Sequence, residues 1–164
     1  MPTIVRWFSA CLLLAPLLAG CGDYPRDAEG SLRRARADAM RVGVSHDPPF
    51  VVLAAGAEPT GTDIALVRAL AEVQGARVEW VADGHDGLMR QLLGYRLHLV
   101  VGGHGHDSPW QAHVGWSRTW HVRAGGDGAL YARRFALPPG ENAWQVEVDR
   151  FLLHRETRGA GAAP

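Results

Sequence analysis

The chain of 164 residues has no lysine, no excess of charge of either sign and few cysteines. Its seventeen basic residues are all arginine and are matched by seventeen acidic residues, so nothing in the charge points to nucleic acid or to an acidic surface as a partner. The absence of lysine indicates a GC-rich coding bias rather than seventeen dedicated arginine sites. A spanning helix needs about 20 apolar residues, and the apolar stretch 7–19 is shorter.

That stretch is instead typical of a secretory signal. Arg6 supplies the positive charge before it, and it ends in Leu18-Ala19-Gly20-Cys21. This ending resembles the lipobox of bacterial lipoproteins, in which small residues precede the cleaved bond and the cysteine thiol takes the lipid. We therefore expect a signal peptide over residues 1–20 and lipidation at Cys21. The alternatives are an ordinary signal peptide cut at a small residue, or a buried apolar helix.

The mature chain would then have no free cysteine with which to form a disulfide bond. Cys11 would leave with the signal and Cys21 would be acylated, so the mature chain must fold on its apolar core alone. We expect residues 21–39, rich in Arg and Asp, to be a polar tether with a short helix over 31–39. One domain should follow over 40–155, and the Gly/Ala-rich end, 156–164, should be a flexible tail.

Within the domain, apolar periodicity predicts strands and helices in alternation. The strands are expected at 40–44, 77–81, 97–101 and 134–137, and the helices at 62–74, 86–93 and from 142 onward. Thr62 or Asp63, Asp86, and a capping box over 142–145 are the expected helix starts. On the 62–74 helix, the apolar residues from Ile64 to Val73 form one broad stripe that should be buried. Such alternation implies an α/β fold with a mostly parallel sheet.

Five segments resemble, in order and spacing, the first lobe of the family 3 periplasmic solute-binding proteins. They are RVGVSHDPPF (41–50), GTDIALVRALA (61–71), DGL (86–88), LHLVVGG (97–103) and VGWS (114–117). A sixth, ALPPGENAW (136–144), resembles the strand, turn and helix that return the chain to that lobe. These proteins are receptors, often for amino acids, that feed ABC importers. The resemblance implies a single lobe of a periplasmic-binding-protein-like fold, with helices on both faces of the sheet.

Two departures from the family qualify what the resemblance implies. The family has a whole second lobe where this chain has only residues 121–133, so we expect a first lobe alone. Family members that bind amino acids hold the ligand carboxylate with an arginine after the third strand, and Trp110 stands at that place here. The residue three places earlier is Asp107, which would repel a carboxylate.

In open α/β sheets, ligands bind beyond the carboxyl ends of the strands. The loops there, 45–47, 83–86 and 103–107, carry four His and four Asp residues. His and carboxylate side chains are also ligands for zinc, copper or nickel, although the alternative is that these are solvated loop residues. The expected ligand-binding residues are His46, Asp47, Phe50, His104, His106, Asp107 and Trp110, and the expected metal ligands are His104 and His106, with His46 as a possible third. For Trp110 and Trp120, the sequence leaves two alternatives: the ring stacks on a ligand, or it covers the apolar core.

Together these patterns predict a lipoprotein tethered on the periplasmic side of a bacterial membrane. It would bind a small polar solute or a partner protein as an accessory of ABC-type uptake or sensing. Its expected partners are the lipid bilayer through Cys21, the solute, and an importer or sensor protein. The alternatives are a periplasmic metal-binding lipoprotein and a pure protein-interaction module. We expect no cofactor, apart from the divalent metal of the first alternative, and no enzymatic activity, because no nucleophile and base are paired in the motifs.

Overall fold

A computed structural model describes residues 24–103, 108–124 and 130–160. Its main sheet has the strand order β2-β1-β3-β7-β4. Strand β1 pairs in parallel with β2 and β3, whereas β7 pairs antiparallel with β3 and β4. Four of the five strands therefore share one direction, which confirms the expected mostly parallel sheet. The strands are β1 (Ala39–Val44), β2 (Arg77–Ala82), β3 (Leu99–Val101), β4 (Gly115–Trp116) and β7 (Ala136–Leu137).

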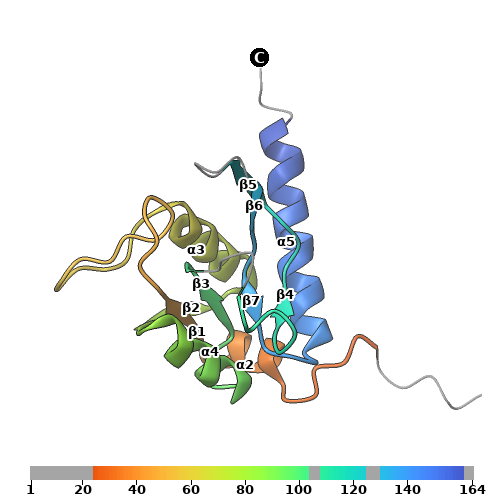
Figure 1. Cartoon of the computed structure of the whole chain (residues 1–164). Helices are drawn as coiled ribbons and strands as arrows, with labels where there is room; N and C mark the ends of the chain where they lie inside the picture. Colours follow the sequence, from red (N-terminus) through yellow and green to blue (C-terminus); the bar gives the residue numbers. More distant parts are fainter. Residues whose placement is uncertain (1–23, 104–107, 125–129, 161–164) are drawn as a thin grey trace, which may run out of the picture.

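Helices cover both faces of this sheet, as expected (Figure 1). One core lies between the sheet and three helices, α2, α3 and α5, and Trp144 of α5 is completely buried in it. A second core lies on the opposite face, where Leu88, Met89 and Leu92 of α4 pack against Val100 of β3. The helices are α2 (Ser31–Ala37), α3 (Thr62–Gln74), α4 (His85–Leu93) and α5 (Asn142–Ala160).

The expected strands and helices are all present, but the expected helix caps are wrong. Gly61 precedes α3 and Gly84 precedes α4, and neither supplies a side-chain cap. The carboxylates of Asp63 and Asp86 bind distant partners instead. The capping box over 142–145 does not form either, because the Gln145 N–H donates to the Glu141 carbonyl at 3.0 Å, which makes Glu141 rather than Asn142 the residue before the helix. The Gln145 side-chain amide donates to the Trp116 carbonyl at 3.0 Å.

The apolar stripe of α3 is narrower than its sequence predicts. Ile64, Val67, Leu70 and Ala71 are buried, whereas Val73 is 69% exposed. The buried face of α3 continues from Val67 through Ala71 to Gln74, and Val73 lies beyond its margin.

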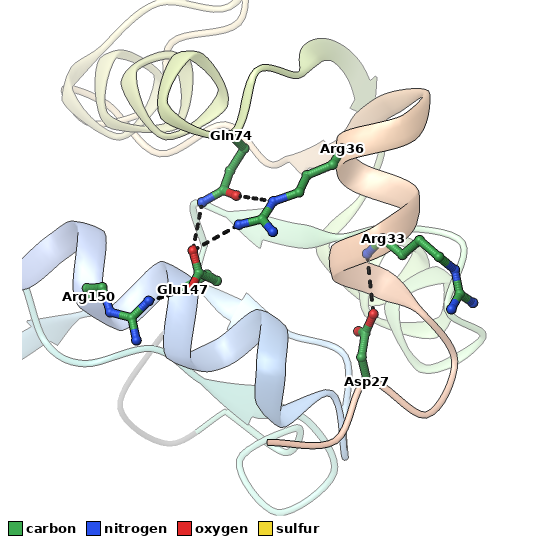
Figure 2. Close-up of polar contacts among 6 residues, drawn as sticks. All are labelled: Asp27, Arg33, Arg36, Gln74, Glu147 and Arg150. Carbon is green, nitrogen blue, oxygen red and sulfur yellow. Dashed lines mark hydrogen bonds and ion pairs between the residues drawn. The ribbon is translucent and has the colours of Figure 1, made fainter. Parts of the chain in front are cut away.

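The segment expected to be a tether packs on the lobe from Arg26 onward. The N–H group of Ala143 donates to the Arg26 carbonyl at 2.9 Å. Figure 2 shows the Arg36 guanidinium between Gln74 of α3, at 2.8 Å, and Glu147 of α5, at 3.1 Å. In the same view, Asp27 accepts from the backbone N–H of Arg33 at 3.3 Å. Residues 26–37 are therefore part of the folded lobe.

The C-terminal helix is longer than the predicted domain. Helix α5 continues to Ala160, through residues expected to belong to a flexible tail. The expected signal peptide and Cys21 lie outside the described residues. Of the helices in the described part of the chain, none has both the length and the apolar composition to span a membrane.

Where the family has a second lobe, the chain forms a two-stranded hairpin. It consists of β5 (His121–Ala124) and β6 (Leu130–Arg133), which pair antiparallel with His121 opposite Arg133. These two strands form a sheet of their own rather than extending the main sheet. Figure 1 shows the hairpin and α5 extending beyond the sheet in the same direction. The chain is thus a single lobe with one hairpin above its sheet.

Candidate functional site

The loops that follow β1 and β3 lie against each other at the carboxyl ends of these parallel strands. The N–H of Ser45 donates to the Val101 carbonyl at 3.1 Å, and the N–H of Gly103 donates to Oδ2 of Asp47 at 3.3 Å. Gly102 has φ of 82°, and a Cβ atom there would lie 2.2 Å from the Ser45 carbonyl oxygen. A glycine at 102 is therefore required for this close approach.

A tight turn after β1 brings Asp47 next to the start of α3. The N–H groups of Phe50 and Val51 donate to the Asp47 carbonyl, at 3.0 and 2.9 Å. The Phe50 carbonyl then accepts from the N–H of Asp63 at 3.1 Å. Gly61, with φ of 118°, allows the chain to pass the turn, since a Cβ there would lie 2.2 Å from the Phe50 oxygen. The carboxylates of Asp47 and Asp63 consequently face the same space.

Arg133 of β6 binds both carboxylates. Its Nη1 atom donates to Oδ2 of Asp47 at 2.9 Å, and its Nη2 atom donates to Oδ2 of Asp63 at 2.6 Å. The guanidinium carbon lies 3.7 Å from the centroid of the Phe50 ring and 6.0 Å from that of Trp120. The Arg133 side chain is 13% exposed and that of Asp63 is 2% exposed. We call Asp47, Phe50, Asp63 and Trp120 the cation pocket, with Arg133 inside it.

The charges in this pocket do not cancel, because two carboxylates face one guanidinium. Burial raises the pKa of the Asp63 carboxyl above its usual range, and the ion pair with Arg133 acts in the opposite direction. Two buried atoms of the pair, Oδ1 of Asp63 and Nε of Arg133, have no hydrogen-bond partner within the described structure. A buried polar atom without a partner destabilises the arrangement that holds it. The pocket therefore binds a cation but does not satisfy all the polar atoms involved.

Two other residues predicted to bind a ligand, His46 and Trp110, make hydrogen bonds within the lobe. His46 accepts a hydrogen bond at Nδ1 from the N–H of Leu53, at 3.1 Å, which holds the chain just after the turn. Trp110 donates from Nε1 to Oδ1 of Asp86 at 2.8 Å and meets the ring of His113 edge-on. Next to Asp86, His85 lies against the Gly103 loop, and burial lowers its pKa although Asp86 opposes the shift.

Of the predicted site residues, the structure thus brings Asp47 and Phe50 together. His104, His106 and Asp107 lie outside the described residues. Over residues 24–103, 108–124 and 130–160, no three His, Cys, Asp or Glu side chains are grouped so that they could hold a metal ion.

Sequence reasoning missed two of the residues that define the pocket. The sequence predicts a helix cap at Asp63 and places Arg133 only in the short connection over 121–133. No local pattern marks either residue, because Arg133 is 86 positions from Asp47 and 70 from Asp63. Trp120, for which the sequence allows two roles, packs at the boundary of the pocket and the core, 6.4 Å from the rings of Phe50 and Phe135.

A single α/β lobe with polar groups at its strand ends is the architecture of a solute-binding domain. The model of the bacterial extracellular solute-binding proteins, family 3, matches residues 40–160, and the chain belongs to this family. No curated protein matches it.

Solved structures share the fold. A point mutant of domain 1 from TmArgBP, in its arginine-bound form, has a TM-score of 0.68 at 20% identity, with 77% of this chain and 98% of that chain covered. AncCDT-1, described as an ancestral cationic amino acid solute binding protein, has a TM-score of 0.68 at 15% identity, covering 79% and 95%. A periplasmic binding protein of high arginine specificity from Salmonella typhimurium has a TM-score of 0.63 at 10% identity, covering 74% and 94%. At these identities, the likeness shows the fold alone.

Proposed function

We propose that this chain is a lipid-anchored solute-binding lobe that binds a small cationic solute in the cation pocket. The observation that carries the proposal is the convergence of the Asp47 and Asp63 carboxylates on one guanidinium, which lies over the face of Phe50. Carboxylates accept charge-assisted hydrogen bonds from guanidinium and ammonium groups. An aromatic face attracts the same cations through its quadrupole. An anionic solute would instead meet two negative charges.

The solved structures support this choice of ligand and of a single lobe. Domain 1 from TmArgBP is described in an arginine-bound form, so a first lobe without its partner lobe holds a cationic amino acid in that protein. The Salmonella typhimurium protein and AncCDT-1 are likewise described as arginine-specific and as binding cationic amino acids.

Cys21 would hold the lobe at the periplasmic side of a bacterial membrane, where it would pass its solute to an ABC importer or report it to a sensor protein. Family membership supports the transport setting. AncCDT-1 is also described as a precursor of cyclohexadienyl dehydratase, so the fold has been adapted to catalysis elsewhere. Ion pairing and stacking hold a cation without transforming it, and we therefore propose binding rather than catalysis for this pocket.

One lobe presents only one wall to a solute. Part of the solute then stays in contact with water, and its hydrogen bonds compete with those of the solvent. Binding must also offset the loss of translational and rotational freedom. For a solute the size of an amino acid, we expect a dissociation constant in roughly the high micromolar range.

The test is calorimetric titration of the full chain in detergent with arginine, lysine, glutamine and glutamate. Arginine or lysine should bind and glutamate should not. Asp47→Asn should weaken the binding, because the pocket loses half of its negative charge. Asp83→Asn is the matched control, since Asp83 is an exposed carboxylate after β2 that caps the adjacent N–H of Gly84. Binding of glutamate, or unchanged binding in Asp47→Asn, would contradict the proposal.

A further inference from the structure

The position of Arg133 raises the question of how a solute enters the pocket at all. We propose that Arg133 is a built-in occupant of the cation pocket: its guanidinium holds the place of the solute's cationic group, and a solute binds only by displacing it. This inference rests on the proposed function of the same site.

The contacts of Arg133 are those of a guanidinium ligand. Two carboxylates from different elements, the turn after β1 and the first turn of α3, bind its two terminal nitrogens at 2.9 and 2.6 Å. The plane of Phe50 covers the guanidinium carbon at 3.7 Å. A planar cation with several donors in a fixed geometry satisfies all three contacts at once, which an ammonium group does not. The pocket therefore has the chemistry to recognise a free guanidinium compound.

The occupant is incompletely satisfied. Nε of Arg133 and Oδ1 of Asp63 are both buried, and neither has a partner among the described residues. A solute that is free to approach the pocket in its own orientation is not restricted to the path of the β6 backbone, and can place a donor on the unused oxygen of Asp63. Such a solute gains a hydrogen bond that Arg133 does not make.

The occupant is also carried on an element that can move. Among the residues that the structure describes, strands β5 and β6 pair only with each other, outside the five-stranded sheet. The hydrogen bond from the Trp120 N–H to the Arg133 carbonyl, at 3.1 Å, joins the two arms of the hairpin at its base, and the His121 ring of β5 lies 5.8 Å from the ring of Phe50. A two-stranded hairpin is marginally stable by itself. Withdrawal of β6 would free the pocket without disturbing the main sheet.

Self-occupancy has a quantitative consequence. The apparent dissociation constant of a ligand equals its intrinsic value divided by the fraction of molecules whose site is vacant. If Arg133 fills the pocket in at least about nine molecules of ten, its removal strengthens binding of a guanidinium solute by at least about tenfold. Binding of a neutral solute would not change, because it does not need the two carboxylates.

The experiment compares wild type with Arg133→Met in the full chain in detergent. Met keeps an unbranched apolar stem beside Phe50 and removes the cation. Arg134→Met is the matched control, since the adjacent Arg134 stacks at 4.8 Å over Trp116, outside the pocket. We expect Arg133→Met to bind L-arginine at least about tenfold more tightly than wild type and Arg134→Met to bind it as wild type does. Millimolar methylguanidinium should raise the melting temperature of Arg133→Met, whereas its neutral analogue methylurea should not.

Arg133→Met leaves two carboxylates without their cation, so the Arg133→Lys variant is measured alongside it. The proposal is overturned if either folded variant binds L-arginine no better than wild type. It is also overturned if neither variant folds, with or without methylguanidinium, because Arg133 would then be a structural ion pair only.

The two proposals fail in different ways. Equal arginine binding by wild type and Arg133→Met supports the proposed function and overturns the built-in occupant. Binding by Arg133→Met alone supports the built-in occupant and contradicts the proposed function of the wild-type chain.

Discussion

The carboxylate of Glu141 accepts a hydrogen bond of 2.7 Å from the backbone N–H of Ser31, and so joins the turn before α5 to the first residue of α2. It also accepts from the N–H of Glu29 at 2.8 Å. Gly30, which precedes α2, has no side chain with which to cap the helix. The first N–H group of α2 is therefore bound by a residue that lies 110 positions away in the chain, whereas those of Leu32 and Arg33 are bound by Asp27.

We predict that Glu141→Gln destabilises the lobe by about 1.5–3 kcal/mol, the usual contribution of buried hydrogen bonds to a charged group. The amide keeps one acceptor but directs a donor toward a backbone donor. Urea denaturation of the two proteins measures the difference. Glu147→Gln, in α5, is the control: Glu147 pairs with Arg36 and Arg150 near the surface, where an ion pair contributes about 1 kcal/mol or less. Equal losses in both variants would contradict the capping role of Glu141.

A second prediction concerns acid. Burial, with the nearby Arg34, lowers the pKa of His98 from 6.5 to about 4. Its Nδ1 accepts from the N–H of Arg41 at 2.9 Å, which requires the neutral ring. Below pH 6.5, the His98 ring becomes protonated in the unfolded chain, whereas in the folded lobe it stays neutral until the pH nears 4. Stability from His98 is therefore complete above pH 6.5 and is lost as the pH falls toward 4.

Between pH 7.5 and 4.5, this linkage amounts to about 2–3 kcal/mol. His98→Asn, whose side-chain oxygen replaces the Nδ1 acceptor, should lose less stability than wild type over this range, by roughly that amount. Urea midpoints at the two pH values provide the comparison, which subtracts the carboxylates common to both proteins. An equal pH dependence of the two proteins would show that His98 is not responsible.

A third prediction concerns the close approach of Gly102, after β3, to Ser45, after β1. Gly102→Ala would place a methyl group 2.2 Å from the Ser45 carbonyl oxygen, so β3 and the turn after β1 must separate. Gly140→Ala is the matched control, since Gly140 also has a positive φ, of 77°, but open space around its Cβ position. We expect Gly102→Ala to be less stable than Gly140→Ala by about 1–3 kcal/mol, the cost of overpacking. Melting temperatures of the two variants test this, and similar values would mean that the loops separate freely.

A fourth prediction tests the proposed membrane attachment. Cys21→Ala removes the thiol that would take the lipid, so the protein should leave the detergent phase in a Triton X-114 partition. Cys11→Ala, a change within the expected signal, is the control and should partition as wild type does. Membrane attachment of Cys21→Ala equal to that of wild type would exclude lipidation at Cys21.

The sequence by itself determined the order of the helices and of β1, β2, β3 and β7, because periodicity records which side of each element is apolar, and that is a property of neighbouring residues. The same periodicity does not mark the short strands β4, β5 and β6. The buried positions of α5, Trp144, Val148, Phe151 and Leu152, follow from spacing alone. The single-lobe architecture also follows from the sequence, since residues 121–133 are too few to form a second lobe.

Only the tertiary structure decided what the polar side chains bind. A residue such as Asp63 is a good helix cap by local propensity, yet in the fold its carboxylate meets Arg133 at 2.6 Å. Gly61 takes the position that the sequence assigns to a capping side chain. In the same way, the polar segment around α2 reads as a tether until Glu141 and Ala143 supply partners for its backbone. The physical reason is that a buried charge selects its partner by proximity and desolvation, which depend on how distant segments pack and not on the residues beside it.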